Sequence, residues 1–253
     1  MMRQLSKTNL ASFGLPERLR CSLGIAKAAE GASSIEEAAR AICEFFFDEL
    51  VDPAGNPACA LVRLYVTQPF ARLDGDLQDF ARRAAGDHAV RADTRCLTLL
   101  GTVGLEPEWN SRTTSRGHKA IPLLSAEVVE KAPMISQLIK AFGLQVSDVV
   151  GDSTVVRDLG GKTYGVFFVP DAANSPYIPA QDEFVGPYSI RSVIGCGGSV
   201  ASGEMFALVL FTRVHMKPES AERFRALALD AKAALRGFLA GQVFDAPDGS
   251  RRG

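Results

Sequence analysis

The 253-residue sequence lacks the features that mark several specialised protein classes. Its 28 basic and 29 acidic residues leave a formal net charge of −1, so no global positive field favours nucleic acid or an anionic membrane. The longest continuous apolar run, residues 205–211, is too short to cross a bilayer, and the N-terminal residues contain no apolar leader stretch. We therefore predict a cytoplasmic protein with no nucleic-acid or membrane partner.

Cysteine and histidine are too few and too dispersed for the common covalent and metal frameworks. The five cysteines are odd in number and contain no C-x-x-C pair, which argues against a disulfide framework and against a zinc or iron–sulfur site. The three histidines are far apart in the sequence, and no carboxylate or cysteine accompanies them at ligand spacing. The sequence therefore predicts reduced thiols and no metal site, and it identifies no cofactor.

Catalytic motifs are missing as well. The glycine cluster at residues 195–198 lacks the Lys-Ser/Thr pair of a P-loop, and residues 197–201 end in alanine where a nucleophile elbow has glycine. No carboxylate pair and no Ser/His/Asp order stands out. We therefore predict a protein that is not an enzyme and has no catalytic residue.

The sequence does contain a well-marked pair of strands around which the rest is organised. Residues 188–194 alternate apolar and polar side chains, as in a strand with one buried face, whereas residues 205–211 are continuously apolar, as in a central strand. The glycines between them, within residues 195–203, permit positive φ angles and predict the turn of a hairpin.

Local patterns predict the remaining elements. Helices are expected over residues 17–30, 35–50, 76–85, 125–142 and 218–238, and strands over residues 59–66, 95–103 and 164–169. Pro133 should bend the fourth of these helices or delay its start. Residues 104–120 and 170–182 should be irregular connections, the second because it is rich in proline and small residues.

The order of these elements predicts the fold class. Strands follow one another as neighbours and hairpins more often than as βαβ units, which favours an α+β fold with a mainly antiparallel central sheet. N-terminal helices and a long C-terminal helix should flank this sheet. We expect a flexible lead-in over residues 1–14, one domain over residues 15–240, and a disordered tail over residues 241–253.

The connection at residues 104–120 carries most of the candidate ligand-binding side chains. These are Trp109, Asn110, Arg112, Ser115 and His118, and Trp109 is the only tryptophan of the chain. An aromatic plate surrounded by hydrogen-bonding groups and cations can enclose a small anionic or planar ligand. The alternative is that Trp109 plugs the edge of the core while its polar neighbours satisfy the backbone of a long loop.

Three motifs make the sequence resemble a known family. They are Trp109-Asn-x-Arg-x-x-Ser-x-Gly-His118, Ser175-Pro-Tyr-Ile-Pro-Ala-Gln181 and Ser192-Val-Ile-Gly-x-Gly-Gly198. Together with the order of the elements, they resemble the GAF-like input domains attached to bacterial PAS-containing sensor kinases. The resemblance extends over about residues 33–238.

The resemblance implies a sheet with a ligand-sized pocket on one face and a helical face that pairs with a second subunit as a homodimer. The connections after the second and third strands would roof the pocket, which makes Tyr177 a lid residue and Tyr188 a wall residue. Cys196 stands where the family pattern has an aromatic residue and would alter the pocket floor. No output segment follows residue 238, so a separate kinase or another signalling partner is expected.

The leading hypothesis is a cytoplasmic sensory domain in which an unidentified small molecule changes the packing of the terminal helices. Two alternatives remain open. One is a thiol-dependent redox enzyme of GAF fold, similar to a methionine sulfoxide reductase, that uses Cys196 or Cys96. The other is a ligand-free dimerisation module, in which Trp109 and its neighbours are only structural.

Overall fold

The computed structural model of the protein describes residues 7–150, 164–200, 203–238 and 243–244. Within these residues, six strands form one sheet in the order β5-β4-β3-β8-β7-β6, and every neighbouring pair in it is antiparallel. The strands are β3 (Cys59–Pro69), β4 (Arg95–Gly104), β5 (Ala120–Pro122), β6 (Tyr164–Val169), β7 (Ser192–Ser199) and β8 (Met205–Thr212). The predicted α+β fold class is confirmed, and with it the antiparallel sheet and flanking helices that the GAF-like resemblance implied.

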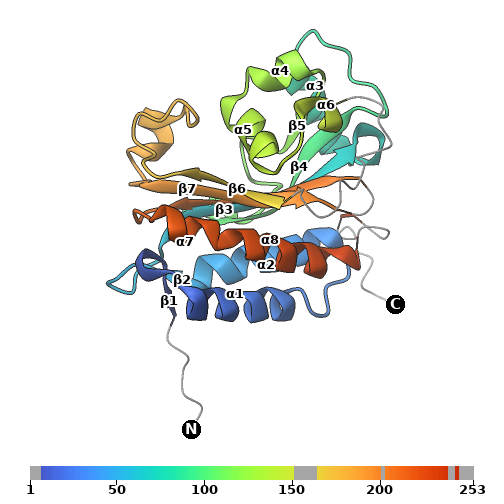
Figure 1. The fold of residues 1–253 in the computed structure, drawn as a ribbon. Helices are drawn as coiled ribbons and strands as arrows, with labels where there is room; N and C mark the ends of the chain where they lie inside the picture. Colours follow the sequence, from blue (N-terminus) through green and yellow to red (C-terminus); the bar gives the residue numbers. More distant parts are fainter. Residues whose placement is uncertain (1–6, 151–163, 201–202, 239–242, 245–253) are drawn as a thin grey trace.

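Helices cover one face of the sheet in two layers (Figure 1). α2 (Ile35–Glu49) and α8 (Phe224–Arg236) contact the strands, and α1 (Leu15–Ala28) packs on both of them from outside. The short α7 (Pro218–Glu222) leads into α8. Ser34 caps the start of α2, and its hydroxyl accepts a hydrogen bond from the amide of Glu37 at 2.9 Å.

Short helices and irregular segments cover the opposite face, which we call the loop face (Figure 1). They include α4 (Ala126–Glu130), α5 (Pro133–Ala141), α6 (Val146–Val149), η3 (Pro107–Asn110) and η4 (Gln181–Val185). α3 (Gly75–Ala85) lies beside β5, and η2 (Phe70–Arg72) precedes α3 in the chain. The helix expected over residues 125–142 is divided, and Pro133 begins its second part. This late start is the effect that the sequence predicted for Pro133.

The two faces of the sheet hold separate parts of the core. On β3, Val62 and Leu64 face α2 and α8, whereas Leu61 and Tyr65 face the loop face. β8 is buried along its whole length, as expected of a strand covered on both sides. Alternate residues of the two central strands therefore contact different layers.

The predicted hairpin is confirmed, but its turn lies after the glycine cluster, where Gly203 has a φ of 90° and its amide donates to the carbonyl of Val200. Gly195, Gly197 and Gly198 lie inside β7, which pairs with β8 as far as Ser199 opposite Met205, so the connection begins only after Ser199. A side chain at Gly195 would meet Leu138 of α5 at 2.3 Å. The glycines thus leave room for α5 and for the neighbouring strand rather than for a turn.

The first arm of the hairpin also begins later than predicted. Residues 186–189 form turns after η4, and β7 starts at Ser192 rather than near Tyr188. Ser189 has a positive φ of 54°, which is incompatible with an extended strand at that position. The alternation of apolar and polar residues in this stretch therefore reflects a turn that buries Ile190.

The fold begins before residue 15. Where the sequence predicted a flexible lead-in over residues 1–14, β1 (Thr8–Asn9) pairs in parallel with β2 (Leu50–Val51), and η1 (Leu10–Ser12) follows. Leu10 and Phe13 are buried, and the ring of Phe13 lies 4.9 Å from that of Phe224 in α8. Residues 1–6 and 245–253, which the lead-in and tail predictions also include, lie outside the described residues.

A first testable prediction concerns the contact between α5 and the sheet. A Cβ at Gly165 would lie 1.7 Å from the carbonyl oxygen of Ala141, a backbone atom that cannot rotate away. We expect Gly165→Ala to lower the free energy of unfolding by at least about 2 kcal/mol, measured by urea denaturation.

The matched control is Gly75→Ala, because a Cβ at Gly75 meets nothing within 4 Å and its φ is not positive. This control should change the unfolding free energy by less than about 1 kcal/mol. Equal stability of the Gly165→Ala variant and the wild type would contradict the close approach of α5.

Candidate functional site

The loop at residues 104–119 wraps the edge of β4. β5 pairs with only three residues of β4. Beyond these three residues, the loop covers the edge of β4. The carbonyl of Trp109 accepts a hydrogen bond from Thr102 Oγ1 at 2.8 Å, and Asn110 Oδ1 accepts one from the amide of Gly104 at 2.9 Å. Trp109 packs directly on Gly104, where a Cβ would meet the indole at 2.7 Å. The loop is therefore fastened to the strand it follows.

Trp109 belongs to a group of four rings on the loop face, which we call the aromatic cluster. Its members are Trp109, Phe184, Tyr188 and Phe211. The centroid of Trp109 lies 4.6 Å from that of Tyr188 and 5.6 Å from that of Phe184. Phe184 in turn lies edge-on to Phe211 of β8 at 5.0 Å. The structure thus brings together Trp109 and Tyr188, which are far apart in the sequence and were both predicted as site residues.

A buried arginine lies next to this cluster. Arg63 is 8% exposed. It lies opposite Thr102 in the sheet and two residues along β3 from Leu61, on the same face of the strand. Its Nη2 donates to Ser115 Oγ at 2.9 Å and its Nη1 to the hydroxyl of Tyr65 at 3.3 Å. Its Nε has no hydrogen-bond partner. Ser115, a predicted site residue, is fully buried by this contact.

His118 lies at the end of the same loop and is influenced electrostatically by Arg63. Its φ of 58° places it in the left-handed region, which histidine tolerates better than most residues. Desolvation of the imidazole and, to a smaller extent, the positive charge of Arg63 lower the pKa of His118 below its ordinary value. His118 is therefore neutral at pH 7 while Arg63 is charged.

Arg112 points away from this group, toward α2 and α3. Its Nε lies 2.6 Å from Glu36 Oε1, its Nη1 lies 2.9 Å from Asp74 Oδ2, and its guanidinium lies 4.8 Å from the ring centroid of Phe244. Two carboxylates thus already neutralise this cation. In the structure Arg112 fastens the loop to the starts of two helices, and it does not face the aromatic cluster.

Three other predicted site residues also lie apart from Arg63. Tyr177 is exposed and packs edge-on against Phe167 of β6 at 5.9 Å, rather than against Trp109. Cys196 belongs to the core on the helical face of the sheet. Asn110 is exposed and uses its amide group for the backbone of its own loop.

The cysteines lack the properties of reactive thiols. All five are free and buried. Burial raises the pKa of Cys21, Cys59, Cys96 and Cys196 to about 12 and raises that of Cys43 as well. Thiolate chemistry needs an accessible thiol with a lowered pKa, so neither Cys96 nor Cys196 is suited to it.

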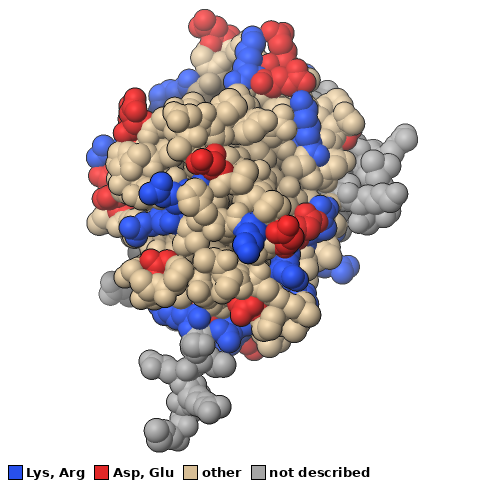
Figure 2. Space-filling model, turned by 60° about the vertical axis from the view of Figure 1, so that its left-hand side comes forward, with Lys and Arg blue, Asp and Glu red and all other residues tan. Residues whose placement is uncertain are grey.

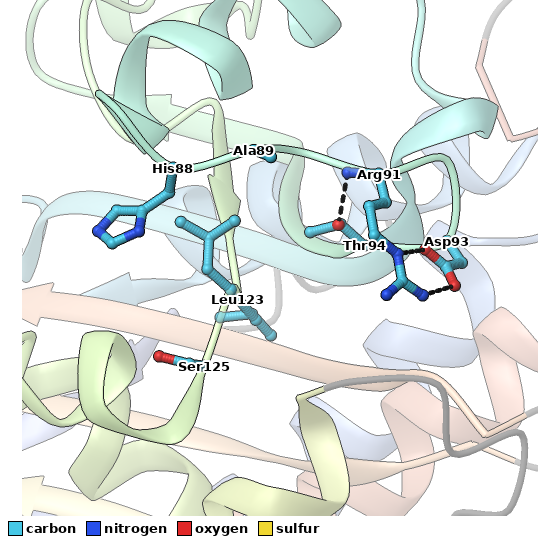
Figure 3. Close-up of a pocket in the computed structure, with 8 residues that line it drawn as sticks. His88, Ala89, Arg91, Asp93, Thr94, Leu123 and Ser125 are labelled. Atoms are coloured by element: carbon cyan, nitrogen blue, oxygen red, sulfur yellow. Dashed lines mark hydrogen bonds and ion pairs between the residues drawn. The ribbon is translucent and has the colours of Figure 1, made fainter.

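A hollow with a volume of about 260 Å³ lies between α3 and α4 (Figure 3). His88 and Ser125 lie on one side of Leu123 in this hollow, and Arg91 and Asp93 lie on the other. The Nε of Arg91 already donates to Asp93 Oδ1 at 3.0 Å, and both residues are exposed. This hollow therefore has no buried polar group directed at a ligand, unlike the surroundings of Arg63.

Three further observations concern metal ions, membrane spans and surface charge. The described residues contain no group of three or more His, Cys, Asp or Glu side chains that could hold a metal ion. None of their helices combines the length and apolar character that a membrane span requires. On the face drawn in Figure 2, basic and acidic side chains are interspersed, and neither sign forms an extended patch.

Comparison with known proteins gives similarities at the level of structure. No family model and no curated protein matches the chain. One similar structure is the GAF domain of a phosphoenolpyruvate-protein phosphotransferase (ptsP) from Coxiella burnetii, with 13% identity, coverage of 88% of this chain and 95% of that chain, and a TM-score of 0.45. Another is the GAF domain of the Acinetobacter phosphoenolpyruvate-protein phosphotransferase, with 11% identity, coverage of 92% and 100%, and a TM-score of 0.42.

A third similar structure is the N-acylhomoserine lactone dependent LuxR family transcription factor CepR2 from Burkholderia cenocepacia. It is 13% identical, the match covers 92% of this chain and 100% of that chain, and the TM-score is 0.41. Two of the three are GAF domains.

Arg63 is the residue of this region that the sequence did not single out. A signal for it exists in the sequence, because it is the only charged residue within the otherwise apolar strand at residues 59–66. A strand that is buried on both faces has no solvent side for such a charge. An isolated arginine in that context therefore indicates a buried guanidinium with a specific polar environment.

The electrostatic link between Arg63 and His118 gives a second testable prediction. Arg63→Met removes a positive charge near the imidazole, and the protonated form of His118 is then less disfavoured. The pKa of His118 should rise toward its ordinary value, as measured by NMR titration of the imidazole resonances. Arg116→Met is the matched control, because Arg116 is in the same loop but is exposed and paired with Glu108. An unchanged pKa in Arg63→Met would show that the two groups are not coupled.

Proposed function

We propose that the protein is a cytoplasmic GAF-like sensory domain whose loop face binds a small molecule. The observation that carries this proposal is the arrangement of a buried, incompletely partnered Arg63 beside an aromatic cluster on the face opposite the helices. Binding sites for small molecules combine apolar and aromatic walls with a few convergent polar groups, and this region has both. Trp109, Tyr188 and His118 are its proposed ligand-binding residues, with Arg63 added to them, and Ser115 holds Arg63 in the free protein.

The central strands supply a route from the loop face to the helices. Arg63 and Tyr65 face the proposed site, whereas Val62 and Leu64, which alternate with them, pack against the helical layer. Within that layer Ser22 of α1 donates to Asp230 of α8 at 2.5 Å. A ligand alters the packing of these helices only if it binds two arrangements of the domain with unequal affinity. We propose that such a difference passes to a separate signalling partner.

The outer helix supports a second element of the proposal, a homodimer formed through the terminal helices. Leu15, Leu19 and Leu23 follow one another at intervals of four residues along the outer side of α1, and each is exposed. Leu229 of α8 is exposed as well. An apolar row on an outermost helix favours contact with a second copy of the same row.

The thiol-dependent redox enzyme receives no comparable support. Its reaction would need a cysteine that is accessible to substrate and ionised near neutral pH. The five buried thiols have raised pKa values, as described above. The ligand-free dimerisation module remains the relevant competitor, and it predicts that no small molecule changes the loop face.

The test of the sensory function uses Trp109, which is the only tryptophan and a member of the aromatic cluster. We expect at least one compound from a panel of small carboxylates, nucleotides and neutral aromatic metabolites to change its fluorescence in a saturable manner. The same compound should change hydrogen exchange in α1 and α8, because the helices respond to the bound state. A panel that leaves both fluorescence and exchange unchanged would favour the ligand-free module.

The dimer is tested by changing its most exposed leucine. Leu23 is 76% exposed, so Leu23→Glu costs little within one subunit but introduces a buried charge at a helix–helix contact. We expect this variant to be monomeric in sedimentation experiments at concentrations where the wild type is dimeric. Leu105→Glu is the control, because Leu105 is exposed at the end of β4 on another part of the surface, and it should leave the dimer intact. A wild-type monomer would refute the dimer.

A further inference from the structure

The charge of Arg63 has no acidic partner among the described residues. Its two hydrogen-bond partners are neutral hydroxyl groups, and no carboxylate of the described residues lies within ion-pair distance of its guanidinium. An arginine keeps its proton under all conditions in which the protein is folded. A buried charge without a counter-ion loses its hydration without compensation, which is why such groups are normally paired.

The neighbouring cation shows the contrast. Arg112 is held by Glu36 and Asp74, so the fold compensates that charge completely with its own side chains. At Arg63 the fold instead provides Tyr65 and Ser115, which accept hydrogen bonds without cancelling the charge. The Nε of Arg63 remains without any acceptor. The guanidinium can therefore still bind an anion, and the described residues do not supply one.

The geometry of the guanidinium and the number of positive charges around it limit the chemical class of that anion. A guanidinium presents a planar fork of donors that matches the two oxygens of a carboxylate. The region offers one fixed positive charge, which balances a single negative charge better than the double charge of a phosphate group. His118 is neutral beside it and adds no second cation at pH 7.

The surroundings also define the orientation of a bound molecule. Desolvation and, after it, the negative charges of Glu106 and Glu108 raise the pKa of Tyr188 at the aromatic end of the region. These carboxylates disfavour an anionic group there. Trp109 packs on Gly104, which lies opposite Leu61 in the sheet, two residues along β3 from Arg63. A flat apolar body would therefore lie toward Trp109 and Tyr188, with the negative group at Arg63.

We propose that the ligand of the loop face is a small monocarboxylic acid with a planar apolar body, and that Arg63 binds its carboxylate. This inference rests on the proposed sensory function and names the chemical class of its ligand. Ser115, which is fully buried against Arg63, occupies one of the donors in the free protein. A guanidinium has five N–H donors, so its Nε–H and a second N–H of Nη2 are still available for two hydrogen bonds to the carboxylate.

The test uses benzoate as the probe, benzamide as its neutral isostere, and inorganic phosphate as a different oxyanion. Calorimetric titrations compare the wild-type 253-residue chain with Arg63→Met and with the exposed-loop control Arg116→Met. We expect benzoate to bind in the millimolar range or more tightly. Arg63→Met should weaken this binding about tenfold or more, whereas Arg116→Met should leave it unchanged.

Ser115→Ala separates an anion-binding role of Arg63 from a purely structural one. If Arg63 binds the carboxylate, loss of the Ser115 hydroxyl frees Nη2, and benzoate should bind Ser115→Ala at least as tightly as the wild type. If Arg63 only fastens the loop, Ser115→Ala should weaken binding as much as Arg63→Met does, and the proposal fails. Thermal unfolding of each variant verifies that it is folded at the temperature of the titration.

The remaining outcomes are also decisive. Equal binding of benzoate and benzamide, absence of benzoate binding, or tighter binding of phosphate than of benzoate would each overturn the assignment to a carboxylate. Failure of this inference remains distinguishable from failure of the sensory function. A neutral compound that changes Trp109 fluorescence equally in the wild type and in Arg63→Met would preserve the sensory function while removing the carboxylate.

Discussion

The pairing of β3 with β8 is the interaction on which the rest of the structure depends. These two strands are far apart in the sequence, yet Cys59 lies opposite Thr212 and Val66 lies opposite Phe206 in one antiparallel ladder. The ladder joins the sheet half made by β3, β4 and β5 to the half made by β6, β7 and β8. It places α2 beside α8 on one face, and it brings Trp109 to Phe184 and Tyr188 on the other. Neither layer would exist in this form without that single junction.

The loop face depends on a second constraint, the absence of side chains at chosen strand positions. Gly165 and Gly197 face each other across β6 and β7, and Gly195 is two residues away, so that α5 and the turn that follows it rest directly on the backbone of the sheet. On the opposite face, Gly101 leaves similar room for the backbone of α2 at Ala39. Glycine lowers the strand propensity at these positions, but because it has no Cβ it lets the layers approach more closely.

Much of the fold could be predicted from the sequence because its signals are local. The capping residues of α2, the apolar strand β8 and the start of α5 at Pro133 each follow from neighbouring residues. The role of Gly195 and Gly197 could not, because it depends on α5, which lies more than fifty residues earlier in the chain. Similarly, Trp109 and Tyr188 were identified separately, but only the β3–β8 junction makes them neighbours. The pairing of Arg112 with Glu36 and the isolation of Arg63 are both non-local, and for that reason the sequence emphasised the first arginine instead of the second.

The burial of all five cysteines has a consequence for the lifetime of the molecule. Oxidants in the surrounding medium meet no cysteine thiol of the folded chain, so intermolecular disulfide cross-links can form only from chains that have opened. The amount of disulfide-linked aggregate would therefore increase with the number of times the chains have unfolded. Its abundance on a non-reducing gel would measure how often the two sides of the sheet have separated.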